Sequence, residues 1–399
     1  MKKSDKSEPE RSRTASKYKV VITGGHHNSA LALAKELTER GMAEVVWYGH
    51  RHTMLGDKSD SAEYKEVSSS GFVFREIKAG KVYRTFNPLH WLRLPFGFFQ
   101  ALWYLLKDRP DLVISFGGYL AAPVVLTAWL LGIPTVTHEQ TTVVGLANKF
   151  IALFADKIFI TWPQSKKYFE GADVVITGLP LREDIFKYDE NHRFFSEKLP
   201  VLYITGGKQG SHIINETVAA ALPKLLKHFN IIHQCGEHSH FNDKEMLENV
   251  VSSLDEKLQA RYMVKTYVFS DEIGQVFHEA DIVLSRAGAH TIYELAALGK
   301  PALFVPIPWV SHNEQYKNAR ILVNEGAAGI LPENRLSPET LRQELFHILE
   351  NLDSYKDGAR RASQAIIFNA TERIIDEVEK ILEAKGKTAG RAGKEPANA

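Results

Sequence analysis

Nearly continuous runs of apolar and β-branched residues alternate along the chain with segments in which apolar residues recur every three to four positions. In the first half these runs occupy residues 19–23, 45–48, 112–116, 135–137 and 157–161. The rhythm restarts in the second half at residues 201–205, 231–234, 263–268, 282–285 and 302–306. Runs without polar alternation are typical of strands buried on both faces of a parallel sheet. The pattern therefore predicts two parallel sheets.

Helical patterns fit between the predicted strands. We expect helices at residues 29–40, 211–228, 291–298 and 314–325. The most apolar stretch, residues 119–136, is interrupted by Pro123, Gly132 and Pro134. It is therefore too short to cross a ~30 Å hydrocarbon layer, and a buried helix followed by a strand is predicted. This alternation indicates an α/β fold of two doubly wound, Rossmann-like domains facing a central cleft.

Changes in composition along the chain suggest the domain boundaries. Residues 18–183 form the predicted N-terminal domain and residues 199–364 the C-terminal domain, because the stretch between them is charged and has no clear strand. A last helix near residues 365–384 is expected. Residues 1–17 and 385–399 are polar and rich in charged or small residues, so we predict that both are disordered tails.

Overall composition excludes several classes of protein. Of the 399 residues, 44% are hydrophobic and 24% charged, as in ordinary globular proteins. Lys and Arg number 49 against 48 Asp and Glu, so no overall attraction to nucleic acid is expected. The single cysteine, Cys235, rules out an internal disulfide framework and fits a reducing compartment. Since the first 19 residues also lack an apolar secretory stretch, a cytoplasmic location is predicted.

The first predicted strand runs into a glycine turn and then a helix, with the sequence Thr23-Gly24-Gly25-His26. Asn28 or Ser29 is the expected N-cap. Paired glycines let an anion or sugar approach the backbone closely. His26 is a candidate general base, because a neutral imidazole can accept a proton from a bound hydroxyl. A purely structural turn explains this motif equally well.

A second glycine turn opens the C-terminal half, with the sequence Gly206-Gly207-Lys208-Gln209-Gly210-Ser211. Its backbone amides and Lys208 could bind phosphate. The spacing matches neither a Walker A loop nor the GxGxxG fingerprint, so NAD or FAD is not expected. No cofactor is predicted.

A third strand–turn–helix unit is Ser285-Arg286-Ala287-Gly288-Ala289-His290-Thr291-Ile292-Tyr293-Glu294. Thr291 should begin a helix whose free amides could bind a diphosphate, and Glu294 could accept hydrogen bonds from a ribose diol. Alternatively, Glu294 is a carboxylate that caps the first helical turn.

Glu314 and Gln315 begin another predicted helix and could read sugar hydroxyls, although helix-start residues facing solvent would look the same. The chain contains no Asp-x-Asp and no evident metal-ligand spacing, so no metal site is predicted. A leaving diphosphate would instead be stabilised by helix N-termini with Arg182 and Lys208. This predicts chemistry that resists EDTA.

Aromatic residues gather beside basic ones in residues 86–99, from Phe86 to Phe99, close to Lys81, Arg84 and Arg93. Such a mixture suits a bilayer surface with anionic headgroups. A core helix would explain residues 98–106 equally well.

These motifs, in this order, resemble the MurG family of glycosyltransferases, glycosyltransferase family 28, over about residues 18–365. The resemblance is strongest at Phe116-Gly117-Gly118-Tyr119, His138-Glu139-Gln140, Gly145-Leu146-Ala147-Asn148, the Gly206 loop, and residues 285–301.

The resemblance implies the GT-B fold and inverting, metal-independent transfer of GlcNAc from UDP-GlcNAc to lipid I, an undecaprenyl-linked acceptor, at the inner face of the cell membrane. It places Thr23, Gly24, Gly25 and His26 near the acceptor and the diphosphate, and Arg182 on the donor. By the same likeness Ser270 contacts uracil through its backbone, residues 289–294 hold diphosphate and ribose, and Gln315 reads the sugar. It also places Glu139, Thr141, Lys208, Gln209, Arg286 and Glu314 among the substrate-binding positions.

The chain departs from the family pattern at several of these positions. The first glycine loop is shortened and followed by His27-Asn28-Ser29, and Thr141, Lys208 and Glu314 replace the family's Asn, Ser and Gln. Three alternatives therefore stay open: a GT-B transferase for another glycolipid, a UDP-GlcNAc 2-epimerase, and a non-catalytic sugar-nucleotide-binding subunit.

Overall fold

The N-terminal half is built on a parallel sheet of seven strands. The computed structural model describes residues 17–25, 27–52, 60–78, 88–207, 209–237 and 241–392. Within them the first sheet has the order β3-β2-β1-β4-β5-β6-β7. Its strands are β1 (Tyr18–Gly24), β2 (Ala43–Gly49), β3 (Val73–Glu76), β4 (Leu112–Phe116), β5 (Thr135–Glu139), β6 (Lys157–Ile160) and β7 (Val174–Ile176). The helices between them are α1 (His27–Glu39), α2 (Ala62–Ser69), α3 (Pro88–Asp108), α4 (Ala121–Leu130) and α5 (Leu146–Ile151).

The C-terminal half repeats this plan with a parallel sheet ordered β10-β9-β8-β11-β12-β13. The strands are β8 (Val201–Thr205), β9 (Asn230–Gln234), β10 (Tyr262–Lys265), β11 (Ile282–Ser285), β12 (Ala302–Phe304) and β13 (Ala328–Ile330). The helices are α6 (His212–Leu225), α7 (Asp243–Ser252), α8 (Glu256–Gln259), α9 (Ile273–Glu279), α10 (Ala289–Ala297), α11 (Glu314–Asn324), α12 (Pro338–Glu350) and α13 (Leu352–Gln364). The prediction of two doubly wound α/β halves is confirmed.

All ten predicted strands are present, and three further strands were missed. The missed strands are β3, β7 and β13, each at an edge of its sheet. Central strands such as β4 are buried at every position, whereas β3 and β7 are partly exposed throughout. An edge strand pairs on one side only and is short here, so it lacks the continuous apolar run that identified the others.

Helices cover both faces of each sheet and close a hydrophobic core on each face. In the first half, Leu33 and Leu37 of α1 pack with Val20 and Ile22 of β1 and with Ile114 of β4. In the second half, one face of the sheet packs against α6 and α12 and the other against α9, α10 and α11. Each sheet therefore presents its loops, rather than its faces, to the other half.

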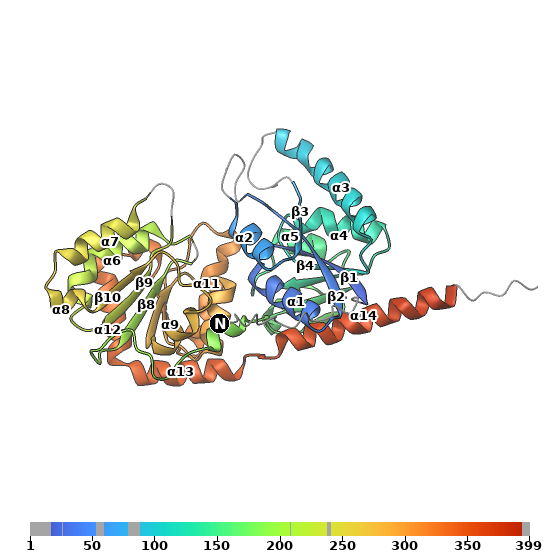
Figure 1. The fold of residues 1–399 in the computed structure, drawn as a ribbon. Coiled ribbons are helices and arrows are strands. Elements are labelled where there is room, and N and C mark those ends of the chain that lie inside the picture. The colour runs from blue at the N-terminus through green and yellow to red at the C-terminus, as the bar shows by residue number, and fades with distance from the viewer. Residues whose placement is uncertain are drawn as a thin grey trace, which may run out of the picture.

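The last helix, α14 (Ala370–Ala392), returns from the second half to the first. Figure 1 shows α13 lying along the C-terminal half and α14, in red, running on along the N-terminal half. Ile374, Ile375, Val378 and Leu382 of α14 are buried in the core formed by β1 and α1. We expected this helix at residues 365–384 and a disordered tail from residue 385. The helix instead begins at Ala370 and continues to Ala392, while the predicted tail of residues 1–17 lies outside the described residues except for Lys17.

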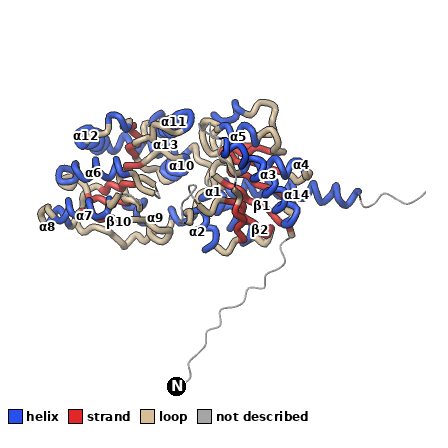
Figure 2. Tube along the Cα trace, turned by 90° about the horizontal axis from the view of Figure 1, so that it is seen from above, coloured by secondary structure: helices blue, strands red, loops and turns tan. Residues whose placement is uncertain are grey.

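The two halves touch through the N-terminal ends of helices. Seen from above in Figure 2, α1 and α2 of one half face α10 of the other. Ser29 of α1 bonds to His290 of α10, with 2.9 Å between Oγ and Nε2. Thr142, between β5 and α5, donates from Oγ1 to Asn318 Oδ1 of α11 at 3.2 Å. These contacts place the predicted glycine loops of both halves at one interface.

Candidate active site

The candidate site lies where the chain order of each sheet reverses. β1 pairs with both β2 and β4, and β8 pairs with both β9 and β11, so each sheet has a switch point at its first strand. In open α/β sheets, ligands bind outside the carboxyl ends of the strands at such points. The three predicted glycine turns follow β1, β8 and β11, so the topology brings all of them to these ends.

The loop after β1 lies against the loop after β4. A Cβ on Gly25 would be 3.2 Å from the carbonyl oxygen of Gly117 and 3.3 Å from Cα of Gly118. Gly117 and Gly118 both have positive φ angles, of 77° and 83°, which favour glycine. The two glycine pairs thus let two loops approach within backbone contact. Thr23 and Gly24, at the end of β1, are buried beneath them.

Helix α1 begins at His27, so the prediction that Asn28 or Ser29 caps it is wrong: both lie inside the helix. The ring of His27 lies 3.2 Å from the carboxylate of Glu66 on α2, measured from Nε2 to Oε2. Ser29 is buried and contacts His290 across the interface. His26, the predicted base, lies outside the described residues.

The loop after β8 is a tight turn held by its own neighbours. Gly207 and Gly210 have φ angles of 86° and 75°, and the carbonyl of Gly207 accepts a hydrogen bond from Gln234 at 3.0 Å. Ser211 is the N-cap residue of α6. Gln209 is exposed on this turn, while Lys208 lies outside the described residues.

Arg286, predicted to bind substrate, is turned inward between loops. Its guanidinium donates to Val305 O at 3.0 Å and to Ser211 Oγ at 2.7 Å, and it pairs with Glu333. Only 9% of the residue is exposed. The observed role of Arg286 is therefore to tie the second and third glycine loops together.

Helix α10 presents the backbone amides of its first turn at its N-terminus. Gly288 is its N-cap, and the amide of Ile292 already donates to Gly288 O at 3.0 Å. The first intrahelical bond is thus made by the amide of Ile292, and the amides of Ala289 and Thr291 precede it in the first turn. The helix begins at Ala289, two residues before the predicted start at Thr291. Such a terminus favours an anion.

Two side chains predicted at this terminus belong to the core instead. Ile292 is fully buried, and Tyr293, 1% exposed, packs edge-on against Trp162 of the N-terminal half. The Tyr293 hydroxyl bonds to both the carbonyl and the amide of Ile367, at 3.1 and 3.0 Å. The helical period turns these positions inward, so the prediction that they contact a ligand is corrected for their side chains.

Arg182 and Glu294 form a two-pronged ion pair. Arg182 Nε donates to Glu294 Oε1 at 2.9 Å, and Nη2 donates to Oε2 at 3.3 Å. Burial alone would lower the pKa of Arg182, but the charge of Glu294 and its hydrogen bonds raise that pKa above its ordinary value. The structure therefore joins two residues that were predicted to bind different parts of the donor, Arg182 the diphosphate and Glu294 the ribose.

Glu139 and Thr141 are both buried and bond to each other. Glu139 Oε1 accepts from the amide and the hydroxyl of Thr141 at 2.9 and 2.8 Å, and Oε2 accepts from Asn148 at 2.6 Å. Burial raises the pKa of Glu139, although these three donors oppose the shift. The observed partners of Glu139 order the loop before α5.

Glu314 and Gln315 open α11 at the same interface. Gln315 Oε1 accepts from the amides of Ala287 and Ile307 at 3.2 and 3.0 Å, so it links the loops before α10 and α11. Burial, followed by the charge of Glu139, raises the pKa of Glu314 to about 7. Ser270 is exposed in the turn between β10 and α9.

Several polar groups at these strand ends were not predicted. Within the described part of the chain, Ser285 Oγ, both side-chain polar atoms of Gln140, and Asn318 Nδ2 are buried without a hydrogen-bond partner; the same is true of Oγ1 of Thr23, a residue that was predicted. Buried polar atoms normally have partners, so these are candidate contacts for a ligand or water. Glu66, which contacts His27, could not be recognised from the sequence as a site residue, because it lies on a separate polar helix.

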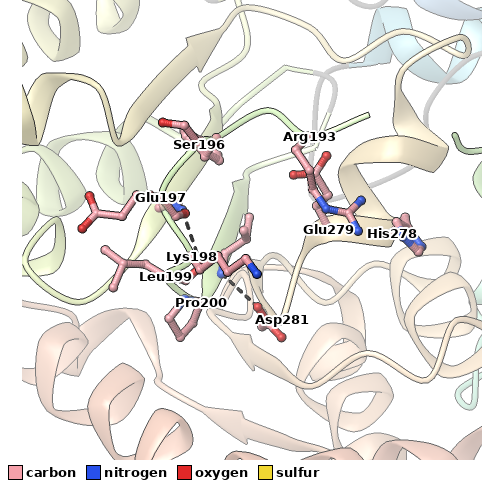
Figure 3. Close-up of a pocket in the computed structure, with 12 residues that line it drawn as sticks. Arg193, Ser196, Glu197, Lys198, Leu199, Pro200, His278, Glu279 and Asp281 are labelled. Carbon is pink, nitrogen blue, oxygen red and sulfur yellow. Dashed lines mark hydrogen bonds between the residues drawn. The ribbon is translucent and has the colours of Figure 1, made fainter. Parts of the chain in front are cut away.

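A cavity of about 500 Å³ lies elsewhere, at the amino ends of β8, β9 and β11. Figure 3 shows it lined by Arg193, Glu197, Lys198, Glu279 and Asp281. Two of its carboxylates have partners outside it: Glu197 pairs with Arg261, and Asp281 with Lys356. Its position is on the edge of the sheet opposite the glycine loops, so it is not the candidate site.

Comparison with known proteins identifies the family of the chain. Residues 21–160 match the glycosyltransferase family 28 N-terminal domain, and residues 201–377 match the glycosyltransferase family 28 C-terminal domain. A Clostridium novyi protein named UDP-N-acetylglucosamine–N-acetylmuramyl-(pentapeptide) pyrophosphoryl-undecaprenol N-acetylglucosamine transferase is 33% identical over 378 residues, which is 92% of this chain and 99% of that protein.

Solved structures agree with this assignment. The crystal structure of Acinetobacter baumannii MurG has a TM-score of 0.68 and 28% identity, over 91% of this chain and 99% of that one. A UDP-GlcNAc 2-epimerase from Neisseria meningitidis has a TM-score of 0.61 over 91% of this chain and 100% of that one, but at 14% identity it shares the fold alone. The chain therefore belongs to the MurG family of GT-B enzymes, glycosyltransferase family 28.

Proposed function

We propose that this enzyme transfers N-acetylglucosamine from UDP-N-acetylglucosamine to lipid I, the undecaprenyl-diphosphate-linked N-acetylmuramyl pentapeptide, and so forms lipid II for peptidoglycan. The observation that carries the proposal is the 33% identity to the curated transferase, which extends over nearly the full length of both chains. Similarity of that extent includes both glycine-loop halves and the helix that joins them.

The C-terminal half binds the donor in this proposal. The first turn of α10, from Ala289 to Thr291, receives the diphosphate, and the positive end of the α10 dipole stabilises the charge that grows as UDP leaves. Glu294 accepts hydrogen bonds from the ribose hydroxyls, and Ser270 contacts uracil through its backbone. Arg182 supplies positive charge beside the diphosphate. No metal ion or cofactor is required for this arrangement.

The reaction is a single displacement with inversion. An acceptor hydroxyl attacks the anomeric carbon, the bond from that carbon to the diphosphate oxygen breaks, and the hydroxyl proton passes to a base. We assign the base to His26 and the sugar contacts to Glu314 and Gln315. A neutral imidazole is suited to accept such a proton near pH 7. The acceptor approaches through the loops of the N-terminal half.

We also propose that the N-terminal half docks on the inner face of the cell membrane. Phe96, Phe99, Trp103 and Leu106 of α3 are 55–65% exposed and recur at the spacing of one helical stripe. Helix α3 packs on α4 and α4 on α5, where Trp129, Leu130, Leu146 and Leu153 are 51–75% exposed. Exposed apolar side chains on three helices that pack in sequence fit a bilayer interface. No helix in the described ranges is long and apolar enough to span a membrane.

This surface differs in extent from the one we expected at residues 86–99. The side chains described in that segment are those from Phe96 onward, and the exposed stripe continues past it to Leu106. Lys107 lies 5.2 Å from the ring of Trp103, so positive charge accompanies the aromatic residues. The surfaces of α4 and α5 were not predicted, because residues 119–136 were interpreted as a buried helix and strand and no surface was assigned to α5.

The activity is tested by incubating the purified protein with radiolabelled UDP-GlcNAc, with and without lipid I, while lipid-phase label and free UDP are followed. We expect labelled lipid and UDP only when lipid I is present. Turnover with a different glycolipid alone would favour another acceptor, and product formed without any lipid would favour epimerisation. Binding of UDP-GlcNAc without turnover would point to a non-catalytic subunit.

Membrane docking is tested by co-sedimentation with vesicles containing anionic lipid. Phe99→Ala should reduce the bound fraction several-fold, because it removes an apolar side chain from the proposed contact. Phe269→Ala is the matched control, since Phe99 and Phe269 are both 65% exposed but Phe269 lies in the other half. Equal effects of the two substitutions would contradict the proposed surface.

A further inference from the structure

The ion pair between Arg182 and Glu294 has the geometry of a rigid support. Two roughly parallel N–H···O bonds, of 2.9 and 3.3 Å, join the planar guanidinium to both carboxylate oxygens. Such a fork fixes the plane of the carboxylate as well as its position, which a single bond would not do. Arg182 approaches from the segment between the two sheets, 112 residues away in the chain.

Burial makes this support necessary. The side chain of Glu294 is 7% exposed and that of Arg182 is 31% exposed. A carboxylate taken out of water needs a nearby counter-charge and hydrogen bonds to remain ionised. Arg182 is the cation paired with Glu294 in the structure, so its loss would leave a buried charge without compensation.

The ion pair with Arg182 leaves lone pairs on the Glu294 carboxylate that can accept hydrogen bonds from a ligand. An ionised carboxylate has about four lone-pair positions, and the guanidinium occupies one on each oxygen. The second position on each oxygen can accept a hydroxyl, which matches the two adjacent hydroxyls of a ribose. Glu294 can therefore hold Arg182 and a ribose diol at the same time.

We propose that Arg182 is a positioning residue for ribose recognition, holding the Glu294 carboxylate in the orientation that accepts both hydroxyls of the donor nucleotide. The inference rests on the proposed function, in which the donor is a uridine diphosphate sugar. It adds a second role to Arg182, beyond charge beside the diphosphate. Recognition of the ribose then depends on a residue that never touches it.

The position of Arg182 couples this recognition to the N-terminal half. Besides Glu294, the charge of Glu66 on α2 favours the charged guanidinium, and Glu66 also contacts His27 at the start of α1. Carboxylate charge from both halves therefore favours the charged form of Arg182. The Glu294 carboxylate is held in this orientation only while the segment between the two sheets, which carries Arg182, is packed as the structure shows.

The test compares binding of UDP and its 2′,3′-dideoxy analogue by calorimetry. The ratio of the two affinities isolates the contribution of the diol and cancels contacts with the phosphates. For the unaltered protein we expect a ratio of about 10 or more, because hydrogen bonds to a charged group are strong. Arg182→Ala should lower the ratio to about 1–3, and Arg182→Lys should lower it similarly, since an ammonium cannot hold both oxygens.

Two further variants test whether Arg182 acts through Glu294 and whether the effect is specific to this ion pair. Glu294→Gln should lower the ratio as Arg182→Ala does, and adding Arg182→Ala to it should change the ratio no further. Arg261→Ala is the matched control, because Arg261 makes a comparable pair with Glu197, at 2.7 Å for both bonds, away from the glycine loops. It should reduce thermal stability and leave the ratio unchanged.

Results that contradict the positioning role can be distinguished from results that contradict the proposed function. If Arg182→Ala and Arg182→Lys weaken both nucleotides equally and keep the ratio, Arg182 acts on phosphate alone and the positioning role is wrong. Should Arg182→Ala fail to fold, the ratio measured with Arg182→Lys decides by the same criterion. If the unaltered protein binds neither nucleotide, the proposed function itself fails and takes this inference with it.

Discussion

Replacing Glu314 by glutamine should change how the stability of the protein depends on pH. Burial and the nearby charge of Glu139 raise the pKa of Glu314 from 4.5 to about 7 in the folded chain. The folded protein therefore keeps a proton that the unfolded chain releases between these pH values. The stabilising contribution is fully present below about pH 4.5 and is lost as the pH rises through 7.

The size of the effect follows from the shift. At about 1.4 kcal/mol for each pKa unit, ionising Glu314 in the folded state costs at most about 3.5 kcal/mol. Glutamine keeps the shape of the side chain but cannot ionise. Glu314→Gln should thus be about as stable as the unaltered protein at pH 5 and more stable at pH 8.5, by up to roughly 5–10 °C in melting temperature.

The assay is thermal unfolding of both proteins at constant ionic strength from pH 5 to pH 9. Glu325→Gln, on an exposed residue directly after the same helix, is the matched control for loss of one negative charge. Titrating groups that do not interact with Glu314 contribute equally to both proteins and cancel in the difference, whereas Glu139, whose charge acts on Glu314, belongs to the measured effect. A difference between Glu314→Gln and the unaltered protein that does not vary with pH would refute the reasoning.

Three further expectations concern the loops, the connection between the halves and metal dependence. Tyr293→Phe should lower the free energy of unfolding in urea by about 1–3 kcal/mol, because both backbone groups of Ile367 lose their partner; no change would contradict that pairing. Gly210→Ala should weaken UDP binding in calorimetry more than Gly171→Ala does, since both have positive φ but only at Gly210 would the new Cβ collide with the Cys235 carbonyl. Turnover should survive EDTA, and activity lost to EDTA and restored by magnesium would contradict a metal-free mechanism.

The central strands and the glycine turns could be predicted because their signals are local. A strand buried on both faces needs a continuous apolar run, and a tight strand-to-helix turn needs glycine, so both leave marks within a few residues. The same reasoning missed β3, β7 and β13, since an edge strand requires neither feature. Helix starts were shifted by a few residues, as at His27, because the capping residue was inferred from side-chain type alone.

The partners of the candidate site residues could not be predicted. Arg182 and Glu294 are 112 residues apart, and Ser29 and His290 are 261 apart. No short-range pattern relates such positions. Likewise, whether a residue after the Gly288 turn faces the interface or the core depends on how α10 packs, and Tyr293 proved to be a core residue.

The sequence by itself determined two repeated strand–helix halves, the turns that carry free amides, and the family to which the chain belongs. Tertiary structure alone decided which side chains those turns bring together: Arg182 on Glu294, Glu314 near Glu139, and Arg286 turned inward. The physical reason is the separation along the chain of the residues that produce each feature. Backbone conformation follows from neighbouring residues, whereas an ion pair or a raised pKa depends on burial and charge contributed by segments far along the chain.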